Sequence, residues 1–169
     1  MSERKLSMRK YYALVAVLVF ALDQFAKWIV IQKIPLNESI NVIDGFFRLS
    51  HVQNPGAAFG LFADSHSSLR IVFLVLFSVF AMGVVGWLLW RSSHTLSTTG
   101  FALALILGGA LGNLWDRLID GYVVDFLAFY FGSYHWPDFN VADSAIVIGA
   151  ILLVAEILFA KAPQEEQAH

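Results

Sequence analysis

Cysteine is absent from the 169 residues of the chain. Its absence excludes disulfides, thiolate metal sites and a thiol nucleophile, so any chemistry must use carboxylates, hydroxyls, histidines or lysines. The five histidines lack the His-Glu-x-x-His spacing of a metalloprotease, and we expect neither a metal nor another cofactor. Charge is scarce as well: charged residues make up 14% of the chain, and the net charge of −2 offers no basic field for nucleic acid.

Hydrophobic residues, in contrast, make up 58% of the chain, and the mean hydropathy of +0.67 lies outside the usual range of a soluble domain. Four apolar runs have about the 20-residue length that a helix needs to cross a bilayer. They predict spans over residues 11–30, 71–90, 99–115 and 141–160. Because no linker or internal repeat divides the chain, we expect residues 1–169 to form a single integral membrane domain, an all-α bundle of four transmembrane helices.

The third run is the shortest of the four, but it is rich in small residues. Small side chains let the backbones of neighbouring helices approach closely. The sequence therefore predicts that this span is held inside the bundle through Gly108, Gly109, Ala110 and Gly112.

The distribution of basic residues predicts the orientation of the bundle. Six Lys and Arg lie within the 27 residues of the two tails and the 91–98 loop, whereas only four lie within the 65 residues of segments 31–70 and 116–140. Because cytoplasmic loops carry the excess of basic residues, we expect both termini in the cytoplasm and the two longer segments outside.

Polar residues interrupt the first and third spans. Asp23 and Lys27 lie four residues apart with the acid first, the favourable order for a helical ion pair. The pair either neutralises itself as a structural contact or tunes a nearby site. Asn113, Asp116 and Arg117 cluster where the third span ends, and there they either cap and anchor the helix or contact a substrate.

Two aspartates lie at the outer boundary of the predicted bundle. Asp143 falls in the first turn of the fourth span, where Asn140 can cap the helix and the helix dipole favours the ionised carboxylate. Asp125 lies in the apolar run YVVDFLAF, where desolvation favours the neutral acid. Two acids at one depth suggest a dyad in which one carboxyl keeps a proton, so that the pair supplies an acid and a base.

The outer segments also carry structural signals. NVIDGFFRLSHV has β-prone stretches on both sides of Asp44-Gly45, which predicts a hairpin, and NPGAAFG predicts a turn with Pro55 and Gly56 at its centre. We therefore expect a small extracytoplasmic β-element over the bundle. The aromatic segment 127–138 is expected to cover the site as a loop or short helix.

Two other chemistries fit parts of this pattern. A Ser-Lys hydrolase would use Lys27 as the base and Ser144 as the nearest candidate nucleophile. A proton-coupled transporter would also place Asp and Lys inside helices. However, the chain shows no inverted repeat, and the polar groups gather at one end of the predicted bundle instead of lining a path across it.

Five motifs occur in order along most of the chain, and together they are specific although each alone is weak. They are DQFAK (23–27), NPGAAFG (54–60), GGALGNLWDR (108–117), GYVVDF (121–126) and FNVADS (139–144). With them the chain resembles the bacterial lipoprotein signal peptidases, or signal peptidase II. The resemblance implies an intramembrane aspartyl endopeptidase with Asp125 and Asp143 as its catalytic dyad. It also implies removal of the signal peptide from prolipoproteins, just before a cysteine that carries a diacylglyceryl group.

The same resemblance implies roles for further motif residues and a cellular location. The partners would be lipid-modified prolipoproteins and the bilayer of the bacterial inner membrane, with the active site near its extracytoplasmic face. Residues expected to bind the substrate or support the dyad are Asn54, Gly56, Asn113, Asp116, Arg117 and Asn140. Residues expected to give structural or electrostatic support are Asp23, Lys27 and Gly108.

Overall fold

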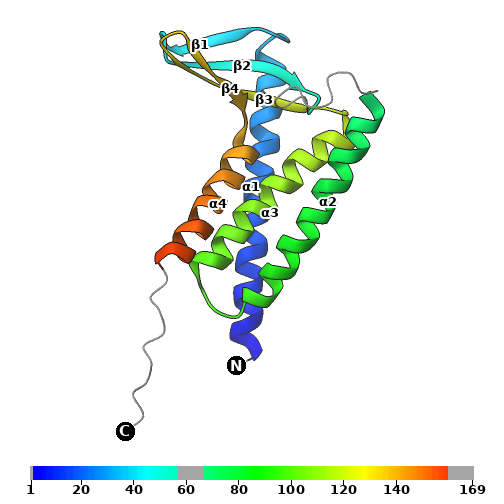
Figure 1. Cartoon of the computed structure of the whole chain (residues 1–169), viewed down its shortest axis with the longest axis vertical. Helices are drawn as coiled ribbons and strands as arrows, with labels where there is room; N and C mark the ends of the chain where they lie inside the picture. Colours follow the sequence, from blue (N-terminus) through cyan, green and yellow to red (C-terminus); the bar gives the residue numbers. More distant parts are fainter. Residues whose placement is uncertain (1, 57–66, 160–169) are drawn as a thin grey trace.

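The computed structural model of the chain describes residues 2–56 and 67–159; Lys161 and motif residues 57–60 lie outside them. A four-stranded sheet lies at one end of a helical bundle, and α1 begins and α4 ends at the opposite end (Figure 1). The helices are α1 (Ser2–Lys33), α2 (Ser67–Ser92), α3 (Thr98–Ile119) and α4 (Val141–Phe159). The strands are β1 (Ser39–Ile43), β2 (Phe47–Asn54), β3 (Val123–Phe131) and β4 (Tyr134–Phe139).

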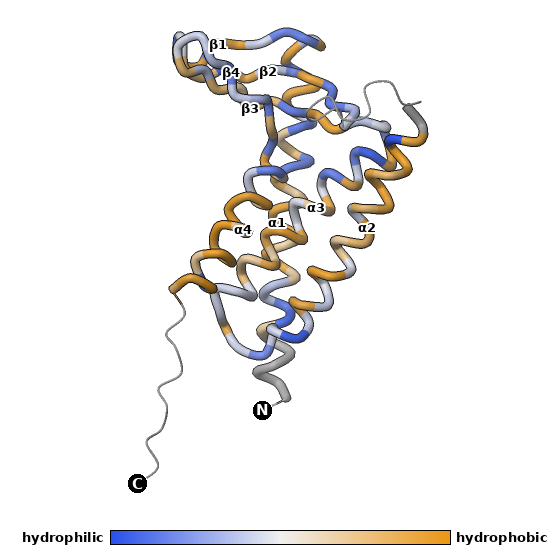
Figure 2. Tube along the Cα trace, viewed as in Figure 1, coloured by the Kyte–Doolittle hydropathy of each residue, from blue (hydrophilic) through white to orange (hydrophobic). Residues whose placement is uncertain are grey.

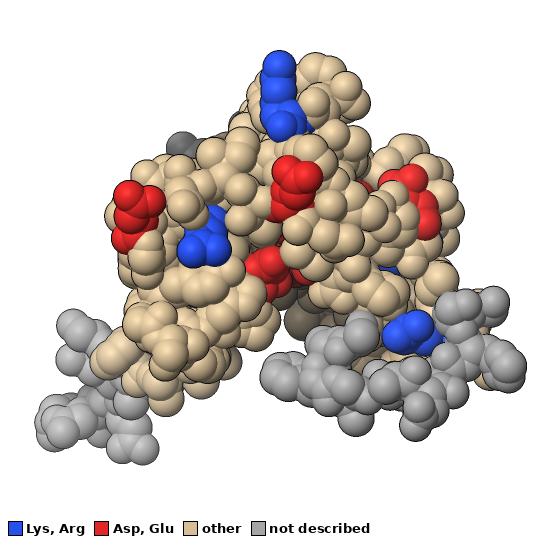
Figure 3. All heavy atoms as spheres, turned by 90° about the horizontal axis from the view of Figure 1, so that it is seen from above, with Lys and Arg blue, Asp and Glu red and all other residues tan. Residues whose placement is uncertain are grey.

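All four helices are long and apolar enough to cross a membrane, as the sequence predicts. Their lengths are coloured mainly hydrophobic, whereas hydrophilic residues concentrate near the ends of the bundle and on the sheet (Figure 2). Seen from the sheet end, charged side chains are few and scattered (Figure 3). The third span was predicted four residues too short, because α3 continues to Ile119 and includes Asp116 and Arg117 in its last turns. The amphipathic end of this helix had been taken for the start of a loop.

Helix α3 is the centre of the bundle and contacts α1, α2 and α4. A Cβ on Gly108 would lie 2.6 Å from the backbone oxygen of Ala16 in α1, and one on Gly109 would overlap the backbone oxygen of Ala142 in α4. The predicted role of these glycines is therefore confirmed, since any side chain would force the helices apart.

The sheet is antiparallel in the order β1-β2-β3-β4. The predicted hairpin is present, but its connection contains three residues, Asp44 to Phe46, instead of two. The amide of Phe46 donates to the carbonyl of Ile43 at 3.1 Å, and Gly45 between them has a φ of 72°. A positive φ of this kind is readily adopted by glycine.

Segment 127–138 differs from the expectation of a loop or short helix, because it forms most of the β3-β4 hairpin. Its aromatic residues pair across strands: the ring of Phe129 stacks on Phe47 at 4.8 Å and on Phe139 at 5.8 Å. Aromatic and β-branched residues favour strands when such partners are present. The β-element consequently has four strands, and the molecule is an α-helical bundle with a sheet.

A small apolar core fastens this sheet to α1. Val30 and Ile34, at the end of α1, pack with Val124 and Phe126 of β3, and all four are buried. The contact fixes β3 relative to the bundle, so Asp125, between the two β3 residues, is held at the junction.

Candidate active site

The two predicted dyad residues meet where the sheet joins the bundle. Asp125 lies on β3 with only 2% of its surface exposed, whereas Asp143 lies in the first turn of α4 and is half-buried. Strand β4 leads directly into α4 through Asn140, so that residue stands between the two carboxyls.

Asn140 is fully buried and bonds to both aspartates. Its amide nitrogen donates to Asp125 Oδ1 at 2.8 Å, and its amide oxygen accepts the backbone N–H of Asp143 at 2.8 Å. The backbone N–H of Asn140 in turn lies 3.3 Å from Asp143 Oδ2. This reciprocal arrangement is a capping box, and it confirms the predicted cap. One residue therefore orients both carboxyls.

Asn54 holds Asp125 from the opposite side. Its amide nitrogen donates to Asp125 Oδ2 at 2.9 Å, and its amide oxygen accepts the N–H of Gly56 at 2.8 Å. Gly56 has a φ of 85°, as the predicted turn requires, and a Cβ there would also overlap Leu74. Gly56 thus acts on the site through the conformation of the Asn54 turn.

Burial raises the pKa of Asp125 to about 7, because the charged carboxylate loses hydration at this position. The amide hydrogen bonds from Asn54 and Asn140 act in the opposite direction, and the neighbouring Asp143 carboxylate raises the pKa further. Near neutral pH, a large share of the molecules therefore carry a neutral acid at Asp125.

A buried ionic cluster lies directly behind the dyad. The predicted pair is present, with Lys27 Nζ 2.7 Å from Asp23 Oδ2, and the same ammonium group lies 2.6 Å from Asp116 Oδ2. Asp116 also accepts a 2.8 Å hydrogen bond from Gln24. The second oxygen of Asp23 accepts the backbone N–H of Ala142 at 2.9 Å, so a residue of α1 helps to cap α4.

Asn113 connects this cluster to the dyad. Its amide oxygen accepts from Lys27 at 3.2 Å, and its amide nitrogen donates to Asp143 Oδ1 at 2.7 Å. Arg117, one turn further along α3, donates to the carbonyl of Asn113 at 3.1 Å. Its guanidinium interacts electrostatically with Asp143, and more weakly with Asp116 and Asp125. These contacts bring the polar end of α3 to the site.

The remaining site prediction and the rival chemistry have different outcomes. Gly108 lies away from the carboxyls, and its contacts are with α1. The hydroxyl of Ser144 donates to the backbone oxygen of Asn140 at 2.8 Å, while Lys27 is engaged by Asp23 and Asp116. Neither contact is that of a Ser-Lys dyad. Over residues 2–56 and 67–159, no three His, Asp or Glu side chains are grouped as metal ligands.

Sequence reasoning missed two members of the site. Gln24 follows Asp23 directly and shares a helix face with Lys27, and that spacing could have identified it. The N–H of Ala142 could not have been found in this way. It meets Asp23 across 119 positions of the chain, and a backbone donor leaves no mark on the sequence.

Comparison with known proteins gives consistent matches over most of the chain. The sequence profile of the signal peptidase (SPase) II family matches residues 15–159. A lipoprotein signal peptidase of Desulforapulum autotrophicum is 49% identical over 150 residues, covering 89% of this chain and 93% of the relative. One of Neisseria meningitidis is 43% identical over 161 residues, covering 95% and 96%. Two solved structures, both of bacterial membrane enzymes, resemble the fold with TM-scores of 0.80 and 0.81 at 30% and 28% identity. They cover 90% and 95% of this chain and 95% and 94% of their own.

Proposed function

Because the chain belongs to the signal peptidase (SPase) II family, whose members are aspartic peptidases, we propose that it removes signal peptides from prolipoproteins with Asp125 and Asp143 as the catalytic dyad. It is a multi-pass membrane protein and a protease. The observation that carries the dyad is Asn140, which bonds to both aspartates and holds them at one place. The substrate class comes from the names of the relatives, which are lipoprotein signal peptidases.

The proposed reaction is hydrolysis without a covalent intermediate. The ionised aspartate takes a proton from a water molecule held between the two carboxyls as that water attacks the scissile carbonyl. The neutral aspartate donates a hydrogen bond to the carbonyl oxygen, where negative charge develops. The raised pKa of Asp125 supports its role as the neutral partner, and the hydrogen bonds from Asn113 and Asn140 support Asp143 as the base.

The proposed cleavage site lies just before a cysteine that carries a diacylglyceryl group, in the bacterial inner membrane. Asp125 and Asp143 lie at the sheet end of the bundle, which the distribution of basic residues assigns to the extracytoplasmic side. At that depth the acyl chains of a substrate can stay in the bilayer while its peptide reaches the carboxyls.

The test is cleavage of a diacylglyceryl-modified prolipoprotein by Asp125→Asn and Asp143→Asn. We expect each change to lower kcat/KM by at least about 10²-fold, since each removes a proton-transfer partner. All four carboxyl oxygens accept a hydrogen bond from an N–H, so an introduced amide loses one of them. The thermal midpoint in detergent must therefore be measured alongside activity.

Asp120→Asn is the matched control, because Asp120 is an exposed acid at the C-terminal end of α3. It should retain wild-type cleavage. Substantial turnover by a folded Asp125→Asn or Asp143→Asn protein would rule out the dyad.

A further inference from the structure

An apolar groove of about 410 Å³ begins at Asp143 and lies between β4 and the outer face of α4. Its volume falls within the range of about 300–1,000 Å³ typical of small-ligand sites. Trp136 and Phe139 of β4 form one wall, and Val147 and Ile148 of α4 form the other. The carboxyl end of the groove is thus polar, and the remainder is apolar.

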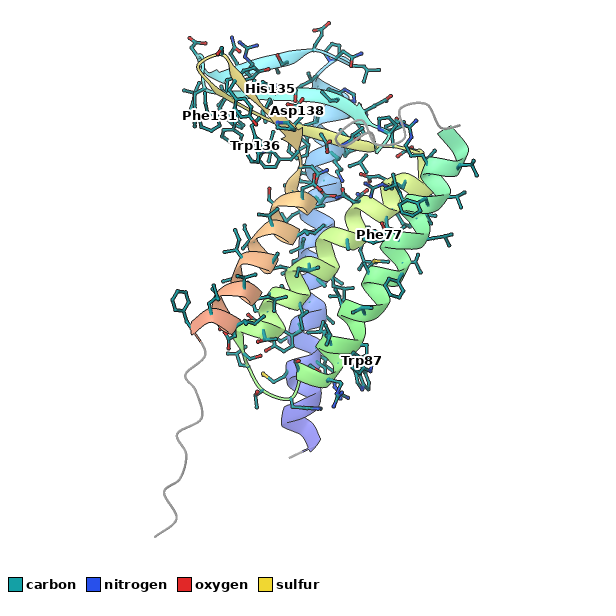
Figure 4. All side chains as sticks on the ribbon, in the orientation of Figure 1. Phe77, Trp87, Phe131, His135, Trp136 and Asp138 are labelled. Atoms are coloured by element: carbon teal, nitrogen blue, oxygen red, sulfur yellow. The ribbon has the colours of Figure 1, made fainter. Side chains whose placement is uncertain are left out.

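The groove exists because the sheet overhangs α4 (Figure 1). The inner face of α4 is buried against α3 through Ala142, Ala145 and Gly149, whereas Val147 and Ile148 are 56% and 51% exposed on the opposite face. Trp136 lies on the side of the sheet that faces the helices (Figure 4). The groove is therefore the corner between the sheet and the membrane-facing side of α4.

One kind of ligand matches both ends of this corner. A chain that fills the apolar part must be continuous with a group that reacts at Asp143. We infer that the groove receives an acyl chain of the diacylglyceryl group on the cysteine that follows the scissile bond. This inference rests on the proposed function, since it assigns a place to one part of that substrate.

The groove acts by direction more than by affinity. An acyl chain that leaves the bilayer for the groove gains no hydrophobic free energy, because lipid tails are as apolar as the groove wall. What it gains is a fixed path that starts at Asp143. Fixing one end of the cysteine side chain fixes the scissile carbonyl relative to the carboxyls, and misplacement by about 1 Å can cost about 10²-fold in rate.

The test fills the groove with a larger side chain. Val147→Trp places an indole in the groove, and Val154→Trp makes the same change two turns further along α4, outside it. The two positions are 56% and 55% exposed, so the substitutions are matched in size, helix face and exposure. Each variant is assayed in nanodiscs with two substrates, a prolipoprotein carrying palmitoyl esters and one carrying acetyl esters that are too short to enter the groove.

We expect Val147→Trp to lower kcat/KM for the palmitoyl substrate about tenfold and to change that for the acetyl substrate less than twofold. Val154→Trp should change neither. Equal behaviour of the two variants with active wild-type enzyme would overturn the groove assignment and leave the proposed function intact. Failure of the wild-type enzyme to cut the palmitoyl substrate would instead refute the proposed function.

A second measurement does not depend on activity. A substrate with a photoreactive group a few carbons from the ester is bound to Asp125→Asn, which keeps the groove unchanged. The groove spans about 7.5 Å of α4, from Asp143 to Ile148, so the reactive group should label Trp136, Val147 or Ile148. Labelling confined to α2, or spread evenly over the helices, would overturn the assignment.

Discussion

At the scale of single residues, three asparagine amides organise the site, and each has one possible orientation. The oxygens of Asn54, Asn113 and Asn140 accept from Gly56 N–H, Lys27 and Asp143 N–H, and their nitrogens donate to the dyad carboxyls. Turning any amide over would face donors with donors. Because an amide is neutral, it orients a carboxyl without forcing it to ionise, as a lysine would. Such a shell suits a pair that must retain one proton.

The Asn54 amide should set the alkaline limb of the pH profile. That limb reports loss of the Asp125 proton as the pH rises through about 7. Removing a donor to the carboxylate destabilises the charged form, so Asn54→Ser should raise the pKa and move the limb to higher pH, by about one unit or less. A serine hydroxyl can still accept the Gly56 N–H, which preserves the turn.

The measurement is kcat/KM between pH 5 and 9, with Ser144→Ala as a control that removes a hydroxyl elsewhere at the site without touching Asp125. A limb that stays in place, or moves to lower pH, would contradict the assignment of the shared proton to Asp125.

Lys27 balances two acids, and its removal should strand both. Lys27→Met leaves the carboxylates of Asp23 and Asp116 buried without a cation, at a cost of about 3–5 kcal/mol. The pairwise change Asp23→Leu with Lys27→Met would not suffice to restore stability, because Asp116 would remain unpaired and Ala142 N–H would lose its acceptor.

The triple change Asp23→Asn, Lys27→Met and Asp116→Asn removes every charge of the cluster and keeps an acceptor for Ala142. We expect its thermal midpoint in detergent to lie well above that of Lys27→Met. If the two proteins melt together, the cost of Lys27→Met does not come from stranded charge. A stable triple variant without activity would show that the charge of Lys27 also serves the reaction.

At the scale of helices, the distance between α3 and α4 decides where Asp143 lies. A Cβ on Gly109 would overlap the backbone oxygen of Ala142, one residue before Asp143, and backbone cannot move aside as a flexible side chain does. Gly109→Ala should therefore lower both kcat/KM and the thermal midpoint. Gly83→Ala is the matched control, because a Cβ at Gly83 in α2 meets nothing within 4 Å. It should be neutral or slightly stabilising, since alanine favours helix over glycine. Equal effects of the two substitutions would show that close α3-α4 contact at Gly109 is not required.

The helices and the dyad candidates could be predicted because their signals are local. Run length gives the spans, and Asp125 stands out in an apolar run. The β3-β4 hairpin was missed because YVVDFLAFYF is apolar on both faces, so alternation does not identify it as a strand. Its register with β2, which opposes Asp125 to Val52, depends on a contact made only after the helices pack. The second partner of Lys27 is equally non-local, since Asp116 comes from another helix.

At the scale of the whole molecule, the two ends of the bundle differ in chemistry. The sheet end holds the buried ionic cluster and the dyad. At the other end, the Arg9 guanidinium lies 3.7 Å from the centre of the Trp90 ring, and Arg91 lies 5.2 Å from that of Trp87 (Figure 4). Basic and aromatic residues of this kind anchor helices at a membrane surface, and the excess of basic residues marks the cytoplasmic side.

The absence of cysteine makes this orientation directly testable. Single cysteines introduced at Asp44 in the β1-β2 connection and at His94 in the α2-α3 connection are both exposed, and they lie at opposite ends of the bundle. No native thiol competes for a reagent. In intact cells with a permeable outer envelope, a thiol reagent that cannot cross the inner membrane should label Asp44→Cys and leave His94→Cys unlabelled. After the inner membrane is opened, both should react, which controls for access. The reverse pattern would place the dyad on the cytoplasmic face. There it could not meet a substrate whose lipid-bearing cysteine lies on the other side, so the proposed function would fail together with the orientation.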